Sequence, residues 1–112
     1  MDKEVRPYTK EEAQKAVLRN IANTTKYWLK ESRAKTTEAK LTGLAFSILA
    51  MIDGSAIGLP AMDIVLRPHI SDEDFHRSRG EKWWQDGMAI NDEVHLHDMW
   101  HEIYEEVKKE DD

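Results

Sequence analysis

Three histidines near the end of the chain are the residues best suited to hold a metal ion. His95, His97 and His101 lie close together in the sequence. If this segment is helical, His97 and His101 are one turn apart and can reach one ion, with Glu93 a further turn back on the same side. At 100° per residue, His95 points about 200° away from His97, so the three histidines cannot serve one ion. The spacing therefore indicates a candidate metal site of His97, His101 and Glu93.

These histidines also have a simpler explanation, because they border the apolar face of the expected last helix. The zinc-protease pattern needs a second histidine four residues after His101, and Glu105 stands at that position. Further ligands would have to come from His69, His76 or another carboxylate. We therefore expect no tightly bound zinc or nickel and no cofactor. A small metal-binding protein or metal-dependent enzyme that uses His97 and His101 is the alternative hypothesis.

The chain does not assemble a nucleophile with a base. The serines lack the Gly-x-Ser-x-Gly setting, and no glycine-rich loop could cradle a phosphate. The absence of cysteine excludes disulfides, thiolate zinc sites and thiol catalysis. Carboxylates such as Asp53 and Glu81 are explained first by turns and helix caps. The sequence therefore favours a protein that is not an enzyme.

Five basic residues share one face of the expected first helix, within about 60° of one another. They are Lys15, Arg19, Lys26, Lys30 and Arg33. The simplest explanation is a solvated face, which amphipathicity alone requires. The alternatives are that this face contacts an acidic protein surface or the phosphates of a nucleic acid. Because the net charge of the chain is −6, nucleic-acid binding ranks below an acidic protein partner.

Two adjacent tryptophans are the other candidate partner-binding residues. Trp83 and Trp84 point to different sides in either a helix or a strand. One of them can therefore lie at the surface, where tryptophan is a common contact residue. Core packing is nevertheless favoured for the pair, since tryptophan is highly buried on average.

The length and charge of the chain limit the number of domains and the kind of protein that it can be. Its 112 residues suit one domain with its own core and are too few for two. No apolar run approaches the roughly 18 residues of a membrane span, and the charged start lacks a signal-peptide core, so we expect a cytoplasmic protein without a membrane partner. Residues 1–50 carry a net charge of +4 and residues 51–112 carry −10. This asymmetry favours association.

Two long helices are expected in the first half. The first runs from about Thr9 to Arg33, because Thr9 and Glu12 form a capping box before an apolar periodicity. The second follows a cap at Thr36 or Thr37 and ends at Asp53-Gly54, where Gly54 suits the left-handed position after a helix. A strand over 46–52 is the rival interpretation of its apolar run.

The second half is expected to hold shorter elements. Met62–Leu66 reads as a short strand whose partner is either Trp83–Ile90 or a second copy of the chain. Ser71 begins a short helix that ends before Gly80. Asn91 is expected to cap the last helix. The apolar face of that helix is Leu96, Met99, Trp100, Ile103 and Val107.

Together these elements predict an α+β domain, mainly α, with about four helices and a minor short-strand element. We expect a loose N-terminal arm over 1–8, a single globular domain over 9–107 and a charged, fraying C-terminal tail over 108–112. The predicted core contains Trp28, Leu44, Ile48 and Trp100.

Several short motifs between residues 40 and 104 resemble a group of small uncharacterised bacterial and phage proteins. They are Leu41-Thr42-Gly43-Leu44-Ala45-Phe46-Ser47-Ile48-Leu49, Ile52-Asp53-Gly54, Leu59-Pro60, Gly80-Glu81 with Trp83, and His101-Glu102-Ile103-Tyr104. The resemblance implies a bacterial or prophage origin and carries no activity or cofactor. We therefore expect a small acidic interaction or regulatory protein that acts through protein contacts and forms a homodimer.

Overall fold

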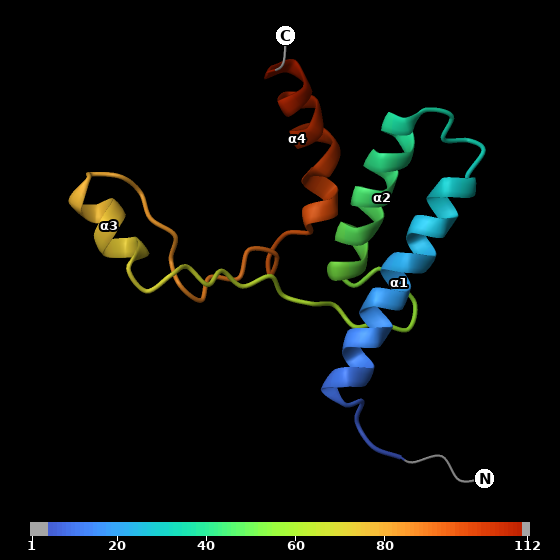
Figure 1. Ribbon diagram of the computed structural model, residues 1–112, viewed down its shortest axis with the longest axis horizontal. Coiled ribbons are helices and arrows are strands. Elements are labelled where there is room, and N and C mark those ends of the chain that lie inside the picture. The colour runs from blue at the N-terminus through green and yellow to red at the C-terminus, as the bar shows by residue number, and fades with distance from the viewer. Residues whose placement is uncertain (1–4, 111–112) are drawn as a thin grey trace.

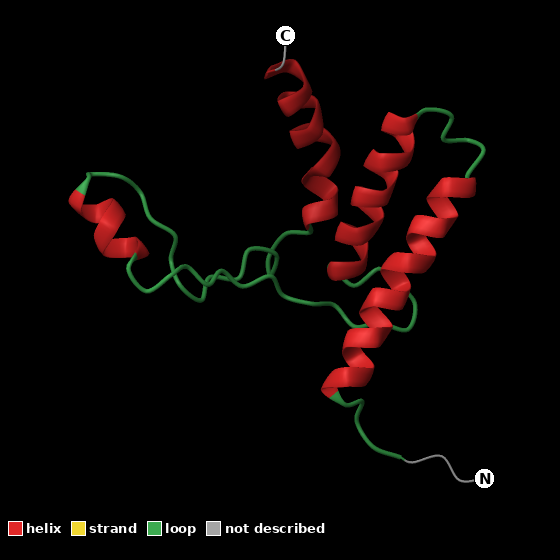
Figure 2. Cartoon of the chain, viewed as in Figure 1, coloured by secondary structure: helices red, strands yellow, loops and turns green. Residues whose placement is uncertain are grey.

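The computed structural model describes residues 5–110 and is mainly helical. Its helices are α1 (Lys10–Lys30), α2 (Thr37–Ile52), α3 (Asp72–Ser78) and α4 (Leu96–Glu110). Both α1 and α4 pack against α2, which lies between them (Figure 1). Figure 2 shows the long loops that carry α3 away from the other helices. Among the described residues, no helix is long and apolar enough to span a membrane.

The start of α1 is the predicted one, and its end comes three residues early. The Thr9 hydroxyl accepts from the Glu12 N–H, and the Glu12 carboxylate accepts from the Thr9 N–H. At the other end, Lys40 Nζ donates to the carbonyl oxygens of Trp28 and Glu31, both at 3.0 Å. A cation there satisfies free carbonyls and complements the helix dipole. The side chain of Lys40, which belongs to α2, thereby caps the C-terminal end of α1.

A close approach at Gly43 joins α1 to α2. A Cβ added at Gly43 would lie 2.6 Å from the ring of Trp28, which is closer than atoms can pack. The Trp28 Nε1–H donates to Ser47 Oγ at 2.9 Å. Glycine therefore lets the indole ring lie flat against the α2 backbone while its polar edge is satisfied.

Polar bonds hold α4 against α2 along most of its length. The Trp100 Nε1–H donates to the Thr42 carbonyl at 3.2 Å, and the Tyr104 hydroxyl donates to Glu38 at 2.7 Å. Lys108 Nζ lies 2.9 Å from the same Glu38 carboxylate. Residues 108–110, expected to fray, therefore belong to α4, and residues 111–112 of the predicted tail lie outside the described residues.

The predicted short strand does not form within residues 5–110. Met62–Leu66 does meet the Trp83–Ile90 segment, but only through an isolated antiparallel bridge between Val65 and Ala89. Three backbone bonds support this bridge, including Ile90 N–H to the Ile64 carbonyl at 3.0 Å. Pro68, two residues after Leu66, has no N–H to donate, so the pairing does not extend further. The structure therefore confirms the mainly α class but does not show, among the described residues, the predicted short-strand element.

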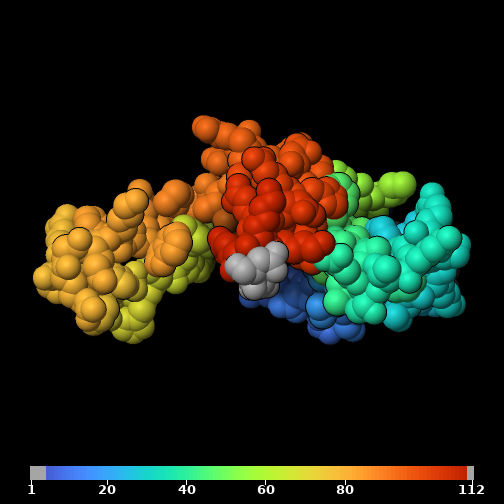
Figure 3. Space-filling model, turned by 90° about the horizontal axis from the view of Figure 1, so that it is seen from above, coloured from blue at the N-terminus to red at the C-terminus, as the bar shows by residue number. Residues whose placement is uncertain are grey.

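Residues 67–88 form what we call the α3 extension, which projects from the bridge. Helix α3 contacts no other described helix, and Figure 3 shows this segment, in yellow and orange, as a separate lobe. Ile70 is 93% exposed, and both Trp83 (39%) and Trp84 (66%) are exposed. The expectation that the two tryptophans pack into the core is therefore wrong, because this segment has no core around it.

The interior is small. Ala34 and Met51 are the buried apolar residues of the described chain, and the predicted core of Trp28, Leu44, Ile48 and Trp100 is only half-buried. The radius of gyration is 18.4 Å, against about 13 Å for a compact domain of this length. The helices form one open layer, so each keeps a face in solvent.

Candidate functional site

The best-enclosed polar group is the carboxylate of Asp53, directly after α2. Its side chain is fully buried. One oxygen accepts from the His97 backbone N–H at 3.0 Å and lies 2.8 Å from His97 Nδ1. The other accepts from Asn91 Nδ2 at 3.3 Å. The residue that ends α2 thus also satisfies a first-turn N–H of α4.

Asn91 links this carboxylate to the loops and does not cap α4. Its Oδ1 accepts from the Ile64 N–H at 2.8 Å, and its Nδ2 donates to the Met62 carbonyl at 2.8 Å. The predicted cap at Asn91 is wrong because α4 begins only at Leu96. Buried backbone groups near the bridge need partners, and the amide supplies both a donor and an acceptor.

The hydrogen bonds decide the charge state of Asp53. Burial by itself raises the pKa of this carboxyl, but the bonds from the His97 backbone, the His97 ring and Asn91 outweigh it. The pKa of Asp53 therefore lies below its ordinary value. A carboxylate that stays ionised in a closed site can orient the His97 ring firmly.

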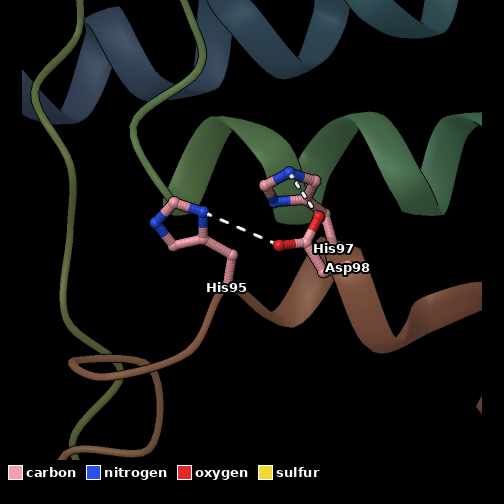
Figure 4. Close-up of side chains that lie close together, drawn as sticks. All are labelled: His95, His97 and Asp98. Carbon is pink, nitrogen blue, oxygen red and sulfur yellow. Dashed lines mark ion pairs between the residues drawn. The ribbon is translucent and has the colours of Figure 1, made fainter.

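Asp53 determines which nitrogen of His97 is available. Because a carboxylate can only accept, Nδ1 of neutral His97 carries the proton and Nε2 keeps its lone pair. Nε2 lies 3.4 Å from an oxygen of Asp98, and His95 Nδ1 lies 3.9 Å from the other oxygen. Figure 4 shows the three side chains gathered at the start of α4. One polar atom from each lies within 4.8 Å of the others.

The structure groups His97 with other side chains than the His101 and Glu93 that helical spacing offered. His95 precedes the first residue of α4, so the rotation of 100° per residue does not apply to it, and its ring stacks on His97 with centroids 5.4 Å apart. His101 instead stacks on Phe46 at 5.3 Å and is not part of the cluster. Glu93 lines a surface depression together with His95 and Asp98.

The remaining histidines lie elsewhere. In the α3 extension, His76 lies 3.4 Å from Asp72 and 3.0 Å from Glu81. His69 Nδ1 lies 2.8 Å from Ser71 Oγ. Both side chains serve local structure, and neither joins the cluster of His95, His97 and Asp98.

The basic face of α1 is partly neutralised. Lys15 pairs with Glu11 at 3.4 Å. Arg33 lies beyond the end of α1 and pairs with Glu31 at 2.9 Å. Arg19, Lys26 and Lys30 are exposed and form no ion pair with another described residue. The predicted five-residue face is therefore a three-residue set of unpaired cations within α1.

The apolar face of α4 is rotated away from α2. Trp100 is half-buried toward α2, while Met99, Ile103 and Val107 are about half exposed. We call these three residues the α4 strip. They follow the helical spacing of one face, so one continuous apolar surface lies in solvent beside the α4–α2 contact.

The chain has no significant match among protein-family models, curated proteins or solved structures. The two buried residues at the centre of the site, Asp53 and Asn91, were not recognised from the sequence, where each was explained as a turn or cap. Asp53 and His97 are 44 positions apart in the sequence, and no periodic pattern connects them.

Proposed function

We propose that this chain is a small, non-catalytic interaction or regulatory protein of the bacterial cytoplasm. The observation that carries the proposal is its accessible surface of 9604 Å². A compact monomer of 13.0 kDa exposes about 6,300 Å². The chain thus presents roughly half as much surface again, which suits a protein that completes its structure in a complex.

The extra surface includes two separate groups of exposed apolar side chains. The α4 strip leaves Met99, Ile103 and Val107 in solvent, and the α3 extension adds Phe75 and Trp84. Large exposed apolar patches mark interaction sites, and exposed tryptophan is a frequent contact residue. These residues supply the affinity of the proposed contact.

We assign the contact to a second copy of the chain. Obligate dimers bury about 2,000 to 5,000 Å² in total, and the surplus on two chains is ample for this. The half with residues 1–50 carries +4 and the other half −10, so antiparallel copies attract each other. Nucleic acid is a weaker candidate, because the whole chain is acidic. Closed symmetric pairs are also the commonest oligomers.

The test is light scattering coupled to size exclusion, over a concentration series of the full chain. Ile103→Gln removes an apolar side chain from the α4 strip, and we expect the dimer to dissociate at least about tenfold more readily. Glu102→Gln, at the neighbouring exposed position, is the matched control and leaves the dissociation constant unchanged. Equal behaviour of the two variants would contradict the assignment of the α4 strip.

A further inference from the structure

We propose that His95, His97 and Asp98 bind one divalent transition-metal ion, with Asp53 as the residue that positions His97. This site differs from the His97, His101 and Glu93 set expected from helical spacing. Metal binding at this site is independent of the interaction function proposed above. The orientation of His97, the ligand distances and the local charge support it.

The orientation of His97 is the first support. Metal-binding histidines almost always donate the N–H of their other ring nitrogen to a carboxylate or carbonyl, which fixes the tautomer and raises ligand basicity. His97 Nδ1 lies 2.8 Å from Asp53, whose side chain is fully buried. In neutral His97 the lone pair of Nε2 therefore faces Asp98, whose Oδ1 lies 3.4 Å away, so the bond to Asp53 already orients the ring toward the proposed ion.

The ligand distances are the second support. Ligands about 2.0 to 2.2 Å from a tetrahedral zinc ion lie about 3.3 Å from one another. Asp98 Oδ1 lies 3.4 Å from His97 Nε2, and Asp98 Oδ2 lies 3.9 Å from His95 Nδ1. One ligand atom from each residue lies within 4.8 Å of the others, so the His95 side chain, which is 57% exposed, must turn toward the ion to complete the set.

The ligand chemistry and charge are the third support. Two imidazoles and one carboxylate suit zinc and its neighbours, whereas magnesium and calcium prefer oxygen ligands alone. The positive end of the α4 dipole opposes a cation, but the carboxylates of Asp98 and Asp53 both lie at that end. Three protein ligands leave a fourth position open for water or for another side chain. Glu93 lines the same surface depression as His95 and Asp98.

Isothermal titration calorimetry of the tag-free full chain with zinc chloride at neutral pH tests this site. We expect one zinc ion per chain. His95→Ala removes an exposed ligand and weakens binding at least tenfold, while His101→Ala, the matched histidine stacked on Phe46, leaves the affinity unchanged. Failure to bind zinc stoichiometrically, or an equal loss in the two variants, would overturn the proposal.

Asp53→Asn tests the positioning role with a readout beyond affinity. Loss of an outer-shell carboxylate costs about 10- to 100-fold in metal affinity. Nitrogen NMR shifts of the His97 ring should show the Nδ1–H tautomer in the parent chain and a mixture of tautomers in the variant. An unchanged tautomer with unchanged zinc affinity would remove Asp53 from the site, and the His95→Ala result stands independently of how well this variant folds.

Discussion

At the scale of single residues, one carboxylate connects parts of the chain that the sequence does not connect. Asp53 accepts hydrogen bonds from Asn91 and from two atoms of His97. The sequence correctly placed Asp53-Gly54 at the end of a helix, and Gly54 takes the expected positive φ of 100°. It could not supply the partners of Asp53, since these depend on how α4 docks and not on local spacing.

Replacing Asp53 should therefore destabilise the fold. Asp53→Asn leaves the His97 N–H and its ring with a weaker partner, and charge-assisted bonds contribute more than neutral ones. We expect the free energy of unfolding to fall by about 2 to 4 kcal/mol, measured by urea denaturation followed by circular dichroism. Asp63→Asn, at an exposed carboxylate, is the control and should change stability by less than about 0.5 kcal/mol.

The pH dependence of stability should report the same residue. Because the pKa of Asp53 is lowered in the fold, its contribution is complete above the pKa of an unfolded aspartate, about 3.9. That contribution is lost as pH falls from there through the lower folded pKa. Urea unfolding between neutral pH and strong acid should show a steeper loss of stability for the parent than for Asp53→Asn. Parallel curves would contradict the role given to this carboxylate.

At the scale of elements, the helices were more predictable than their contacts. Capping residues and apolar periodicity located α1, α2 and α3 closely, because both signals are local. The start of α4 was missed because Asn91 looks like a cap in sequence but serves the bridge segment in space. The predicted short strand did not form because the three backbone hydrogen bonds near Pro68 make an isolated bridge and not a sheet.

Gly43→Ala should weaken the α1–α2 contact even though alanine favours helices. The added Cβ would meet the Trp28 ring at 2.6 Å, and such overpacking costs about 1 to 3 kcal/mol, more than the helix propensity gained. Urea denaturation measures the loss. In a Trp28→Phe background the smaller ring relieves the clash, so the cost of Gly43→Ala should shrink. A cost that stays the same would show that the clash with Trp28 is not its cause.

At the scale of the whole molecule, composition predicted a globular domain and the chain is an open layer with a projecting segment. The molecule measures 61 × 42 × 21 Å. Within the described chain, α3 contacts no other helix and the α4 strip stays about half exposed. Hydrophobic content alone cannot distinguish apolar residues buried within one chain from those buried between two, because both patterns look amphipathic in sequence. Trp28 and Trp100 were therefore expected in a core, and they are half-buried because the helices form one open layer.

Salt should affect the proposed dimer only modestly. The opposite charges of the two halves of the chain orient the copies, but exposed ion pairs contribute little and are screened. We expect the dissociation constant to rise by less than about tenfold from low to high salt, measured by light scattering. Complete dissociation at high salt would show that charge, and not the α4 strip, supplies the affinity.

Sedimentation equilibrium of the unmodified full chain tests the central claim most directly, because it gives mass without reference to shape. The exposed apolar surface predicts a species of twice 13.0 kDa at micromolar concentration, with reversible dissociation on dilution. A mass of 13.0 kDa at every concentration would contradict the claim that a second copy covers the open face of this chain.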